Sequence, residues 1–421
     1  MKKVLIICYS FPPYPGIGGR RWGKFVKYFV RQNIECHVIS AKNHCQDQSV
    51  WGEGTTGAGI FHYPIPFRFR RLTTYTGKNI FIRILGRVFR MGVGFTHYSP
   101  YFYSSLSKGQ LLGAASEVIR KQGIRTVIVS GDPYVYYYAS MLKENHDIKL
   151  ILDFRDLWTD DQSYKRGPQV KQKQLGYFHQ CELNAVNRAD LVVGVSNVIT
   201  ERLQSRCTNR QVQFKVIPNG FDHEDYGSMK WKFCESDKLT IVHGGNMSAA
   251  ALLPMIDFLK AYTSLKKSNS ALWDSFEIKL MGNFPPNFAK LVGELDNANI
   301  IVGNEFESNQ KYFQKLLSAH LGIILHPIEY RDAKFITKTF DYFHLNMPIL
   351  AITYSGVVSE FVDRSNIGFS FCPDKPIIPE EFFKKIQNDI RKKEYSSELQ
   401  HQLDRAYNIA YLANMYSQEI C

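Results

Sequence analysis

The chain has 421 residues, of which 44% are hydrophobic and 22% are charged. This composition is typical of globular proteins and excludes a disordered or fibrous chain, and the length predicts roughly two to three domains of about 150 residues. No apolar run approaches the ~18 residues that would span a membrane. The eight cysteines form no CxxC pair, so neither a disulfide framework nor a zinc site is expected. We therefore expect a soluble, cytoplasmic, multidomain protein.

Positive charge is concentrated in the first part of the chain. Residues 1–120 hold 17 Lys and Arg but 4 Asp and Glu, whereas the remaining 301 residues hold 35 of each. Such one-sided charge indicates an anionic partner, namely a membrane surface, a nucleic acid or a phosphorylated substrate, although a solvated basic face would also account for it. No helix-turn-helix, zinc-finger or RRM-type pattern accompanies the charge, so nucleic acid is the less favoured partner.

Short β-branched runs alternate with helical patterns along the chain, as is typical of parallel-sheet α/β units. In the first half, strands are expected at Val4–Cys8, Cys36–Ser40, Thr126–Ser130, Leu150–Asp153, Leu191–Val195 and Phe214–Ile217. A helix is expected after the first strand, because Trp22, Phe25 and Phe29 fall on one apolar stripe. Lys24, Lys27 and Arg31 of this helix are expected to face away from that stripe, toward solvent.

Residues 67–91 form a basic segment within this first half. Apolar residues, among them Phe81 and Phe89, recur at helical spacing between positions 80 and 89. Three arginines fall together on the opposite side of that helix: Arg83, Arg87 and Arg90. The pattern predicts a basic amphipathic helix that lies on an anionic membrane surface. The alternative is that the apolar face packs on the core of the domain.

A second series of alternating strands and helices is expected in the second half of the chain. Strands are expected at Leu239–His243, Phe276–Met281, Ile300–Val302, Leu321–Leu325, Ile349–Ile352 and Gly368–Phe371. The turn-rich segment Ile217–Asp222 separates the two halves. We therefore predict an α/β protein with two doubly wound domains, at 1–220 and 221–400, that face a central cleft. A C-terminal helix at 401–421 is expected to return to the first domain.

Glycine-bearing loops follow several predicted strands, at the sheet edge where open α/β sheets bind ligands. Gly18 and Gly19 come directly before the first helix. Three more glycines follow the first two strands of the second domain: Gly244, Gly245 (next to Asn246) and Gly282. Glycine lets a backbone approach an oxyanion, and helix N-termini offer free N–H groups. The spacing is that of neither a dinucleotide-binding nor a Walker loop, which weakens NAD and ATP as ligands. Plain tight turns are the alternative.

Two charged stretches are candidates for chemistry. The expected strand Leu150–Asp153 leads into Arg155 and Asp156, and charges at a strand end are costly to bury unless they are paired or used. These two residues are expected near an acceptor hydroxyl or a phosphate, with a structural Arg–Asp network as the alternative. In the second domain, Lys338 near a helix start is placed to bind a diphosphate, and Asp341 to accept hydrogen bonds from ribose or sugar hydroxyls. An exposed lysine and an acid that compensates the helix dipole are the alternative.

The order of these motifs resembles that of a retaining glycosyltransferase of family 4 with the GT-B fold, of the type that assembles bacterial surface polysaccharides. The resemblance covers essentially the whole chain. It is carried by the Gly18-Gly19 loop, Asp153–Trp158, Ala189–Ser196, Ile217–Asp222, His243–Asn246, and Lys338–Tyr342 with Pro348. It implies transfer of a sugar from a nucleotide-diphosphate donor to a hydroxyl of a lipid-linked saccharide acceptor, at the inner face of the cell membrane. It implies no metal ion, no cofactor and no nucleic acid.

The resemblance also assigns roles to residues. The donor would be held by Gly18, Gly19, Gly244, Gly245, Asn246, Gly282, Lys338, Thr339 and Asp341. Three residues would act at the reacting sugar, namely Asp156, Tyr137 and Arg155. The first domain would meet the acceptor and the membrane through Arg83, Arg87, Arg90, Phe81 and Phe89.

The sequence departs from the family pattern at three places. The family has two glutamates eight positions apart, where this chain has Ala333 and Asp341. Segment 247–250 supplies no arginine or lysine to the diphosphate, and Tyr137 stands where relatives often carry a histidine. These departures leave two alternatives open: a membrane-attached GT-B scaffold with weak or no catalysis, and a nucleotide-sugar epimerase.

Overall fold

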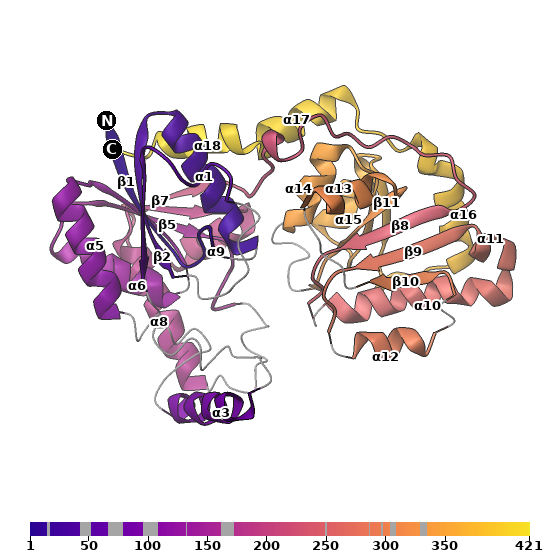
Figure 1. Ribbon diagram of the computed structural model, residues 1–421, viewed down its shortest axis with the longest axis horizontal. Helices are drawn as coiled ribbons and strands as arrows, with labels where there is room; N and C mark the ends of the chain where they lie inside the picture. Colours follow the sequence, from indigo (N-terminus) through magenta and orange to yellow (C-terminus); the bar gives the residue numbers. More distant parts are fainter. Residues whose placement is uncertain are drawn as a thin grey trace. The chain divides into compact units, whose positions relative to one another are not determined.

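The computed structural model describes residues 1–14, 17–42, 52–65, 79–95, 108–131, 133–160, 172–248, 251–285, 287–295, 298–303, 309–328 and 335–421. They form two compact units, Met1–Pro218 together with Ile409–Cys421, and Asn219–Asn408 (Figure 1). The first unit therefore ends near the predicted boundary at residue 220. One segment discussed above, 67–78, and three single residues, Ala249, Ala250 and Ala333, lie outside the described residues.

The first unit is built on a seven-stranded parallel sheet of order β3-β2-β1-β4-β5-β6-β7. Its strands are β1 (Lys2–Cys8), β2 (Ile34–Ala41), β3 (Ile60–Ile65), β4 (Thr126–Ser130), β5 (Lys149–Phe154), β6 (Leu191–Gly194) and β7 (Gln213–Val216). The six strands predicted for this half are all present. The edge strand β3 is an addition, because Pro64 within it weakens the strand pattern.

Helices cover both faces of this sheet (Figure 1). They are α1 (Arg20–Arg31), α5 (Lys108–Gln122), α6 (Pro133–Ser140), α8 (Gln172–Arg188), α9 (Asn197–Arg206) and α18 (Ile409–Ser417), with short 3-10 turns η1 (Ile17–Gly19) and η2 (Met141–Glu144). A further helix, α3 (Ile80–Phe95), contributes no described side chain to either core. One core lies between the sheet and α1 with α18, and the other between the sheet and α5, α6 and α8. This is the doubly wound arrangement.

Helix α1 is buried on more sides than its sequence indicates. Trp22 and Phe25 pack into the core as expected. Lys24 and Lys27, however, are 1% and 5% exposed, so the prediction that they face solvent is wrong. The stem of Lys27 is covered by the segment before β3, where a Cβ on Gly54 would lie 2.9 Å from its Cγ.

The second unit is built on a six-stranded parallel sheet of order β10-β9-β8-β11-β12-β13. Its strands are β8 (Leu239–Gly244), β9 (Phe276–Met281), β10 (Ile300–Gly303), β11 (Leu321–Leu325), β12 (Ile349–Ile352) and β13 (Gly368–Phe371). All of them lie where the sequence predicts. The order of the strands reverses between β1 and β4 in the first sheet and between β8 and β11 in the second. Doubly wound sheets bind ligands at this point of reversal.

Helices cover both faces of the second sheet as well (Figure 1). They are α10 (Leu252–Ser268), α11 (Ser270–Asp274), α12 (Phe288–Gly293), α13 (Asn309–Leu317), α14 (Thr337–Leu345), α15 (Val357–Arg364), α16 (Pro379–Asp389) and α17 (Ser397–Tyr407), with 3-10 turns η3 (His223–Asp225) and η6 (Ile390–Lys392). The core on one face holds side chains of α13, α14 and α15, and the other holds side chains of α10, α12 and α16.

The C-terminal helical stretch is broken at Asn408. Helix α17 places Leu403 in a core of the second unit, whereas α18 places Leu412 and Tyr416 in a core of the first. The prediction that the returning helix begins at residue 401 is therefore corrected to Ile409. Within the described ranges, no helix combines the length and the apolarity that crossing a membrane requires.

Candidate functional site

Three glycines gather at the carboxyl edge of the second sheet, where β8 and β9 end. Gly245 (φ +99°) and Gly282 (φ +130°) lie in the positive-φ region that favours glycine. A Cβ on Gly282 would be 2.3 Å from the Gly245 carbonyl oxygen, and a Cβ on Gly244 would be 2.2 Å from Tyr312 Cε2. The Gly245 N–H donates to the Met281 carbonyl at 2.7 Å, which joins the two loops. Only glycine permits this close approach of backbones.

Lys338 reaches the same edge from the first turn of α14. A Cβ on Gly245 would lie 2.9 Å from Lys338 Cε, so the lysine stem lies directly against this glycine. Burial lowers the pKa of Lys338 to about 8, partly offset by the charge of Asp341. Among the described residues, no carboxylate lies within ion-pair distance of its ammonium, whose recorded neighbour is His243. Because none of the described carboxylates forms an ion pair with it, this partly buried cation is suited to bind an anion.

His243, at the end of β8, holds Lys338 in this position. Its Nε2 lies 3.5 Å from Lys338 Nζ, and its side chain is buried. Burial, and then the charge of Lys338, lower the pKa of His243 well below its usual range. The neutral imidazole can therefore accept a hydrogen bond from the ammonium at Nε2. The sequence interpretation used this loop for its glycines and missed the histidine, although a histidine directly before two glycines at a strand end was a visible signal.

Three other predicted donor-site residues lie nearby with contacts of their own. Asn246 Oδ1 accepts a hydrogen bond from Asn283 at 3.0 Å. Thr339 is buried in the first turn of α14, and its hydroxyl has no partner among the described residues. Asp341 is buried and accepts a hydrogen bond from the Tyr226 hydroxyl. The described part of the chain contains no group of three His, Cys, Asp or Glu side chains that could hold a metal ion.

In the first unit, the loop after β5 is tied to the loop after β1. Arg155 Nη1 donates to the Gly18 carbonyl at 2.9 Å, and Gly19 is the N-cap residue of α1. Asp156 follows Arg155 and is partly exposed, as is Tyr137 on α6. The structure thus brings Gly18, Gly19 and Arg155 together at the carboxyl edge of the first sheet.

Asp153, at the end of β5, has a structural role. Its carboxylate is fully buried and accepts hydrogen bonds from Arg21, from Nε at 3.1 Å and from Nη2 at 2.7 Å. The hydroxyls of Ser130 and Tyr416 also donate to it, at 3.1 and 3.3 Å. An Arg–Asp network therefore exists, but its arginine is Arg21 of α1. Arg155 follows the end of β5 at Phe154, and its guanidinium donates to the Gly18 carbonyl.

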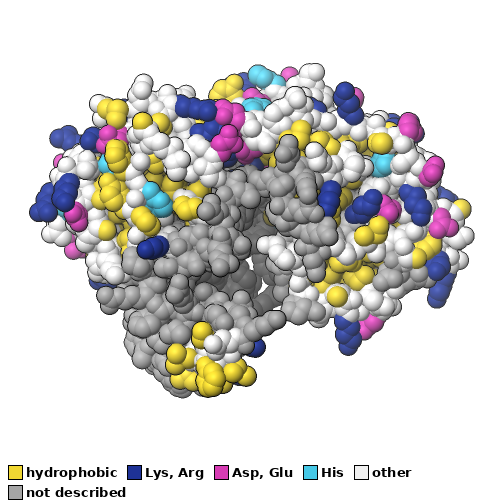
Figure 2. Space-filling model, viewed as in Figure 1, with side chains coloured by type: hydrophobic (Ala, Val, Ile, Leu, Met, Phe, Trp, Pro, Cys, Tyr) yellow, Lys and Arg dark blue, Asp and Glu magenta, His cyan; other side chains and the backbone are white. Residues whose placement is uncertain are grey.

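Helix α3 exposes apolar side chains to solvent. Phe81 is 80% exposed, and Figure 2 shows hydrophobic side chains gathered over this helix. Ile80, Ile84, Leu85 and Val88 are each more than half exposed, and the side chains of Arg83 and Arg87 are exposed as well. The alternative that these apolar residues pack on the domain core is therefore wrong. The side chains of Phe89 and Arg90 lie outside the described residues.

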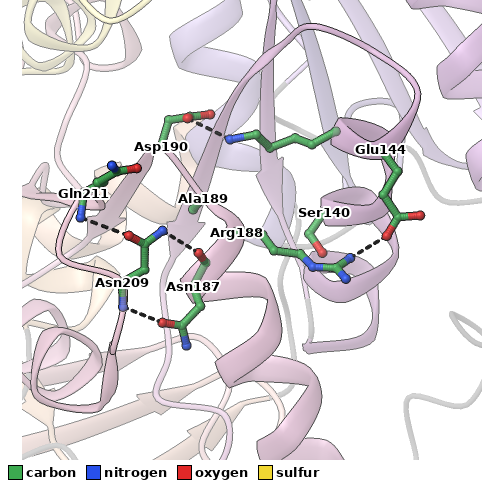
Figure 3. Close-up of a pocket in the computed structure, with 9 residues that line it drawn as sticks. Ser140, Glu144, Asn187, Arg188, Ala189, Asp190, Asn209 and Gln211 are labelled. Carbon is green, nitrogen blue, oxygen red and sulfur yellow. Dashed lines mark hydrogen bonds and ion pairs between the residues drawn. The ribbon is translucent and has the colours of Figure 1, made fainter.

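A pocket of about 340 Å³ lies at the opposite edge of the first sheet, where α6, α8 and α9 lead toward β5, β6 and β7 (Figure 3). Its charged side chains pair with one another: Lys143 with Asp190 at 2.7 Å, and Arg188 with Glu144 at 2.9 Å. Asn187 Oδ1 accepts from the backbone N–H groups of residues 208 and 209. These groups satisfy one another at the amino ends of the strands, so the pocket is not favoured as a functional site.

No family model and no curated protein sequence matches the chain. Several solved structures, however, are similar to it over nearly its whole length. Sucrose-phosphate synthase from Thermosynechococcus elongatus is 12% identical, with a TM-score of 0.68 over 99% of this chain and 98% of its own. Anabaena HepE, in complex with UDP-glucose, is 14% identical, with a TM-score of 0.62 over 99% of both chains. A putative UDP-N-acetylglucosamine 2-epimerase from Listeria monocytogenes is 12% identical, with a TM-score of 0.53 over 99% of this chain and 94% of its own.

The chain has the GT-B fold. The similarities extend over nearly the whole length of each chain, and both sheets have the doubly wound strand order. The predicted fold class of two Rossmann-like domains is therefore confirmed. In the GT-B chain, Lys338 and its glycines lie at the carboxyl edge of the second Rossmann-like domain, and the Arg155–Gly18 contact lies at the carboxyl edge of the first.

Proposed function

We propose that this GT-B chain is a glycosyltransferase that moves a sugar from a nucleotide-diphosphate donor to a hydroxyl of a saccharide acceptor. The observation that carries the proposal is Lys338, a partly buried cation against Gly245 with no carboxylate partner among the described residues. The diphosphate of a donor supplies the missing counter-charge, and backbone N–H groups near Gly244 and Gly245 add hydrogen-bond donors. The similarity to HepE, which binds UDP-glucose, supports this class of donor.

In the proposed reaction, the acceptor oxygen bonds to the anomeric carbon while the bond from that carbon to the diphosphate breaks. The reaction is of the retaining, family 4 type, in which the leaving phosphate receives the acceptor proton, so no protein nucleophile is needed. Lys338 stabilises the negative charge that develops on the leaving diphosphate. Arg155, Asp156 and Tyr137 of the first domain orient the acceptor and the reacting sugar. No cofactor or metal ion takes part in this scheme.

The proposal includes attachment to the anionic inner face of the cell membrane, where a lipid-linked acceptor for surface polysaccharide, O-antigen or capsule, would be met. It is supported by α3, whose apolar residues are exposed beside Arg83 and Arg87. An amphipathic helix of this kind buries its apolar side chains at the level of the lipid headgroups while its arginines contact their phosphates. The excess positive charge of residues 1–120 adds a long-range attraction.

Thermal unfolding of the full chain with UDP, GDP, dTDP or CMP tests the donor site. One of the three diphosphates is expected to raise Tm by a few degrees, because a ligand that binds only the folded state stabilises it, whereas CMP lacks a diphosphate and should raise Tm less. Lys338→Ala should lose the shift, whereas Lys290→Ala, at an exposed lysine of α12, should keep it. No shift with any nucleotide at about millimolar concentration would contradict the proposal and favour the non-catalytic scaffold.

Sedimentation with lipid vesicles tests the membrane site. The chain is expected to sediment with phosphatidylglycerol vesicles and to stay in solution with phosphatidylcholine vesicles. Phe81→Ser should weaken sedimentation, because Phe81 is the most exposed apolar side chain among those described in α3. Tyr411→Ser, at an exposed aromatic residue of α18, is the matched control. Equal sedimentation of the wild type and Phe81→Ser would contradict the role of α3.

Epimerisation of a nucleotide sugar is a second candidate, favoured by the similarity to the putative epimerase. Both activities use a bound nucleotide sugar, but their products differ. An epimerase converts the nucleotide sugar without any acceptor, whereas a transferase releases the nucleoside diphosphate when an acceptor is added. Chromatography of the nucleotide pool with and without added lipid-linked saccharides therefore separates the two.

A further inference from the structure

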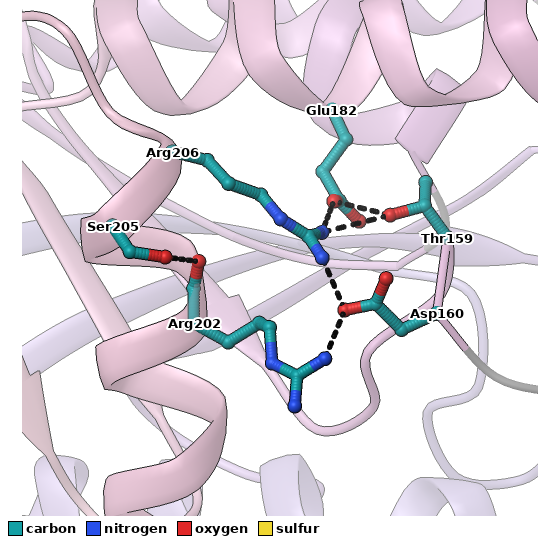
Figure 4. A network of polar contacts seen from close by, with 6 residues as sticks. All are labelled: Thr159, Asp160, Glu182, Arg202, Ser205 and Arg206. Carbon is teal, nitrogen blue, oxygen red and sulfur yellow. Dashed lines mark hydrogen bonds and ion pairs between the residues drawn. The ribbon is translucent and has the colours of Figure 1, made fainter.

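A polar cluster in the first domain holds Thr159 and Asp160, which follow Arg155 and Asp156 in the chain (Figure 4). The Thr159 hydroxyl donates to Glu182 Oε1 at 2.7 Å, and Glu182 lies on α8. Arg206 of α9 donates to the Thr159 hydroxyl at 3.2 Å and also pairs with Asp160. The loop is therefore fixed by two helices only three residues after Asp156.

The near end of the loop is fixed as well. Arg155 donates to the Gly18 carbonyl, and the Asp160 N–H donates to the Leu157 carbonyl at 3.0 Å, which closes a turn. Leu157 and Trp158 pack against the domain core. Residues 155–160 are thus held at both ends, and the orientation of Asp156 depends on both attachments.

Glu182 is a buried acidic residue whose hydrogen bonds within the described structure are incomplete. It is 1% exposed, and its Oε2 atom has no hydrogen-bond partner among the described residues. Two charged groups face Glu182, namely Arg206 and Asp160, and Arg206 Nη1 lies 3.5 Å from Glu182 Oε1. Arg202 lies on the far side of Asp160, with its Nη1 at 3.5 Å from the Asp160 carboxylate. Burial, against the attraction of Arg206, raises the pKa of Glu182 to about 7. A carboxylate oxygen with no donor is costly, so the closed cluster favours the neutral acid.

We propose that Glu182 and Arg206 form a clamp that positions the Arg155–Asp156 loop for the proposed transfer reaction, and that the clamp is tightest while Glu182 carries a proton. Neither residue is a catalytic residue, because each acts through Thr159 and Asp160. The inference rests on the proposed function for the role of the loop, but the clamp itself is a property of the first domain and can be measured without substrate.

The sign of the pH dependence follows from linkage. The closed clamp holds the Glu182 proton up to about pH 7, whereas an opened loop would expose this side chain with its ordinary pKa of 4.5. Opening therefore becomes easier as the pH rises from about 5 to about 7, and stays constant above that range. Glu182→Gln keeps the shape of the neutral acid and cannot ionise, so its clamp is expected to be independent of pH. Glu182→Ala removes the acceptor of the Thr159 hydroxyl and opens the clamp at every pH.

Hydrogen exchange of the backbone amides of residues 155–160 tests the clamp in the full chain. After correction for intrinsic rates, protection of the wild type should fall about 40-fold between about pH 5 and about pH 7. Glu182→Gln should show no such fall in protection. In Glu182→Ala the amides of residues 155–160 should be unprotected at both pH values. Glu144→Gln removes an exposed carboxylate of the same domain and should behave as the wild type. The same pH dependence in the wild type and in Glu182→Gln would overturn the proposal.

Sugar transfer at saturating donor tests the positioning role. Glu182→Ala is expected to lower kcat at least tenfold while the thermal shift with nucleotide is unchanged, and Glu182→Gln is expected to restore kcat. Unchanged kcat in Glu182→Ala would overturn the positioning role. If the wild type shows neither nucleotide binding nor transfer while exchange behaves as expected, the proposed function fails and the clamp stands.

Discussion

Asp153 at the end of a strand and Lys338 at the start of a helix differ in whether a partner within the fold compensates their charge. Asp153 accepts two hydrogen bonds from Arg21 and others from Ser130 and Tyr416, so its charge is compensated within the fold. Lys338 has no such carboxylate among the described residues, and burial lowers its pKa to about 8. Compensated charges are typical of structural networks, whereas an uncompensated one in a glycine-lined edge is a candidate for ligand binding.

Lys338→Met is expected to raise the free energy of unfolding at pH 7 by ~1–2 kcal/mol, because it removes a charge whose burial is unfavourable. The unfolded lysine binds its proton up to a pKa of 10.5, and the folded one up to about 8. Wild-type stability therefore rises between these pH values, and the difference from the variant should shrink there. Urea unfolding at a series of pH values measures this difference in the free energy of unfolding. A variant less stable than the wild type at pH 7 would contradict this reading of Lys338.

Nucleotide affinity is expected to depend on the same proton. Below about pH 7 the ammonium is charged and affinity should be constant, whereas above about pH 8 affinity should fall by up to tenfold per pH unit. Calorimetric titration across this range measures the effect. Lys338→Met, with weaker binding, should show no such fall, and a wild-type affinity that stays constant to about pH 10 would contradict the assignment.

At the scale of elements, local patterns in the sequence predicted twelve of the thirteen strands. Continuous apolar runs between glycine or polar loops identify buried parallel strands, because both of their faces are covered. The exceptions have tertiary causes. Pro64 hides the edge strand β3, and Lys27 of α1 is covered by the segment around Gly54, which no periodicity in α1 indicates.

The Arg21–Asp153 pair connects α1 to β5 and to the end of the first domain, since Arg21 also donates to the carbonyls of Ile217 and Pro218, at 2.9 and 2.7 Å. Asp153→Asn leaves the arginine charge buried and should cost about 3–5 kcal/mol of stability. Urea unfolding measures the loss. Glu117→Gln, which removes an exposed pair with Lys121, should change stability by less than about 1 kcal/mol. Equal effects of the two variants would contradict the structural role of Asp153.

Helix α18 is expected to stabilise the first domain through its apolar contacts with α1. Leu412 is 1% exposed, and its truncation in Leu412→Ala should cost about 2–5 kcal/mol. Met415 on the same helix is 42% exposed, so Met415→Ala should stay within about 0.5 kcal/mol of the wild type. Denaturant unfolding compares the two, and a small effect of Leu412→Ala would contradict this packing.

For the molecule as a whole, the regular alternation of strands and helices predicted two doubly wound domains, and the resemblance of the motifs to a known family implied the GT-B fold. The glycine loops and Lys338 could also be singled out, because their signals are local in sequence. The contacts that define their surroundings could not. His243 and Lys338 are 95 positions apart, Tyr226 and Asp341 are 115 apart, and Thr159 meets Glu182 across 23. Such pairs arise from the topology of the sheets, which no local pattern in a single sequence reveals.

The proposed function depends on binding of the diphosphate of a nucleotide at the edge of the second sheet that carries Lys338. Titration calorimetry tests it most directly when the nucleoside diphosphate identified by thermal unfolding is compared with its monophosphate, at pH 7. We predict that the wild type binds the diphosphate at least about tenfold more tightly, since charge-assisted contacts to a second phosphate are lost in the monophosphate. In Lys338→Met this preference should disappear. An equal preference in the two proteins would contradict the assignment of Lys338.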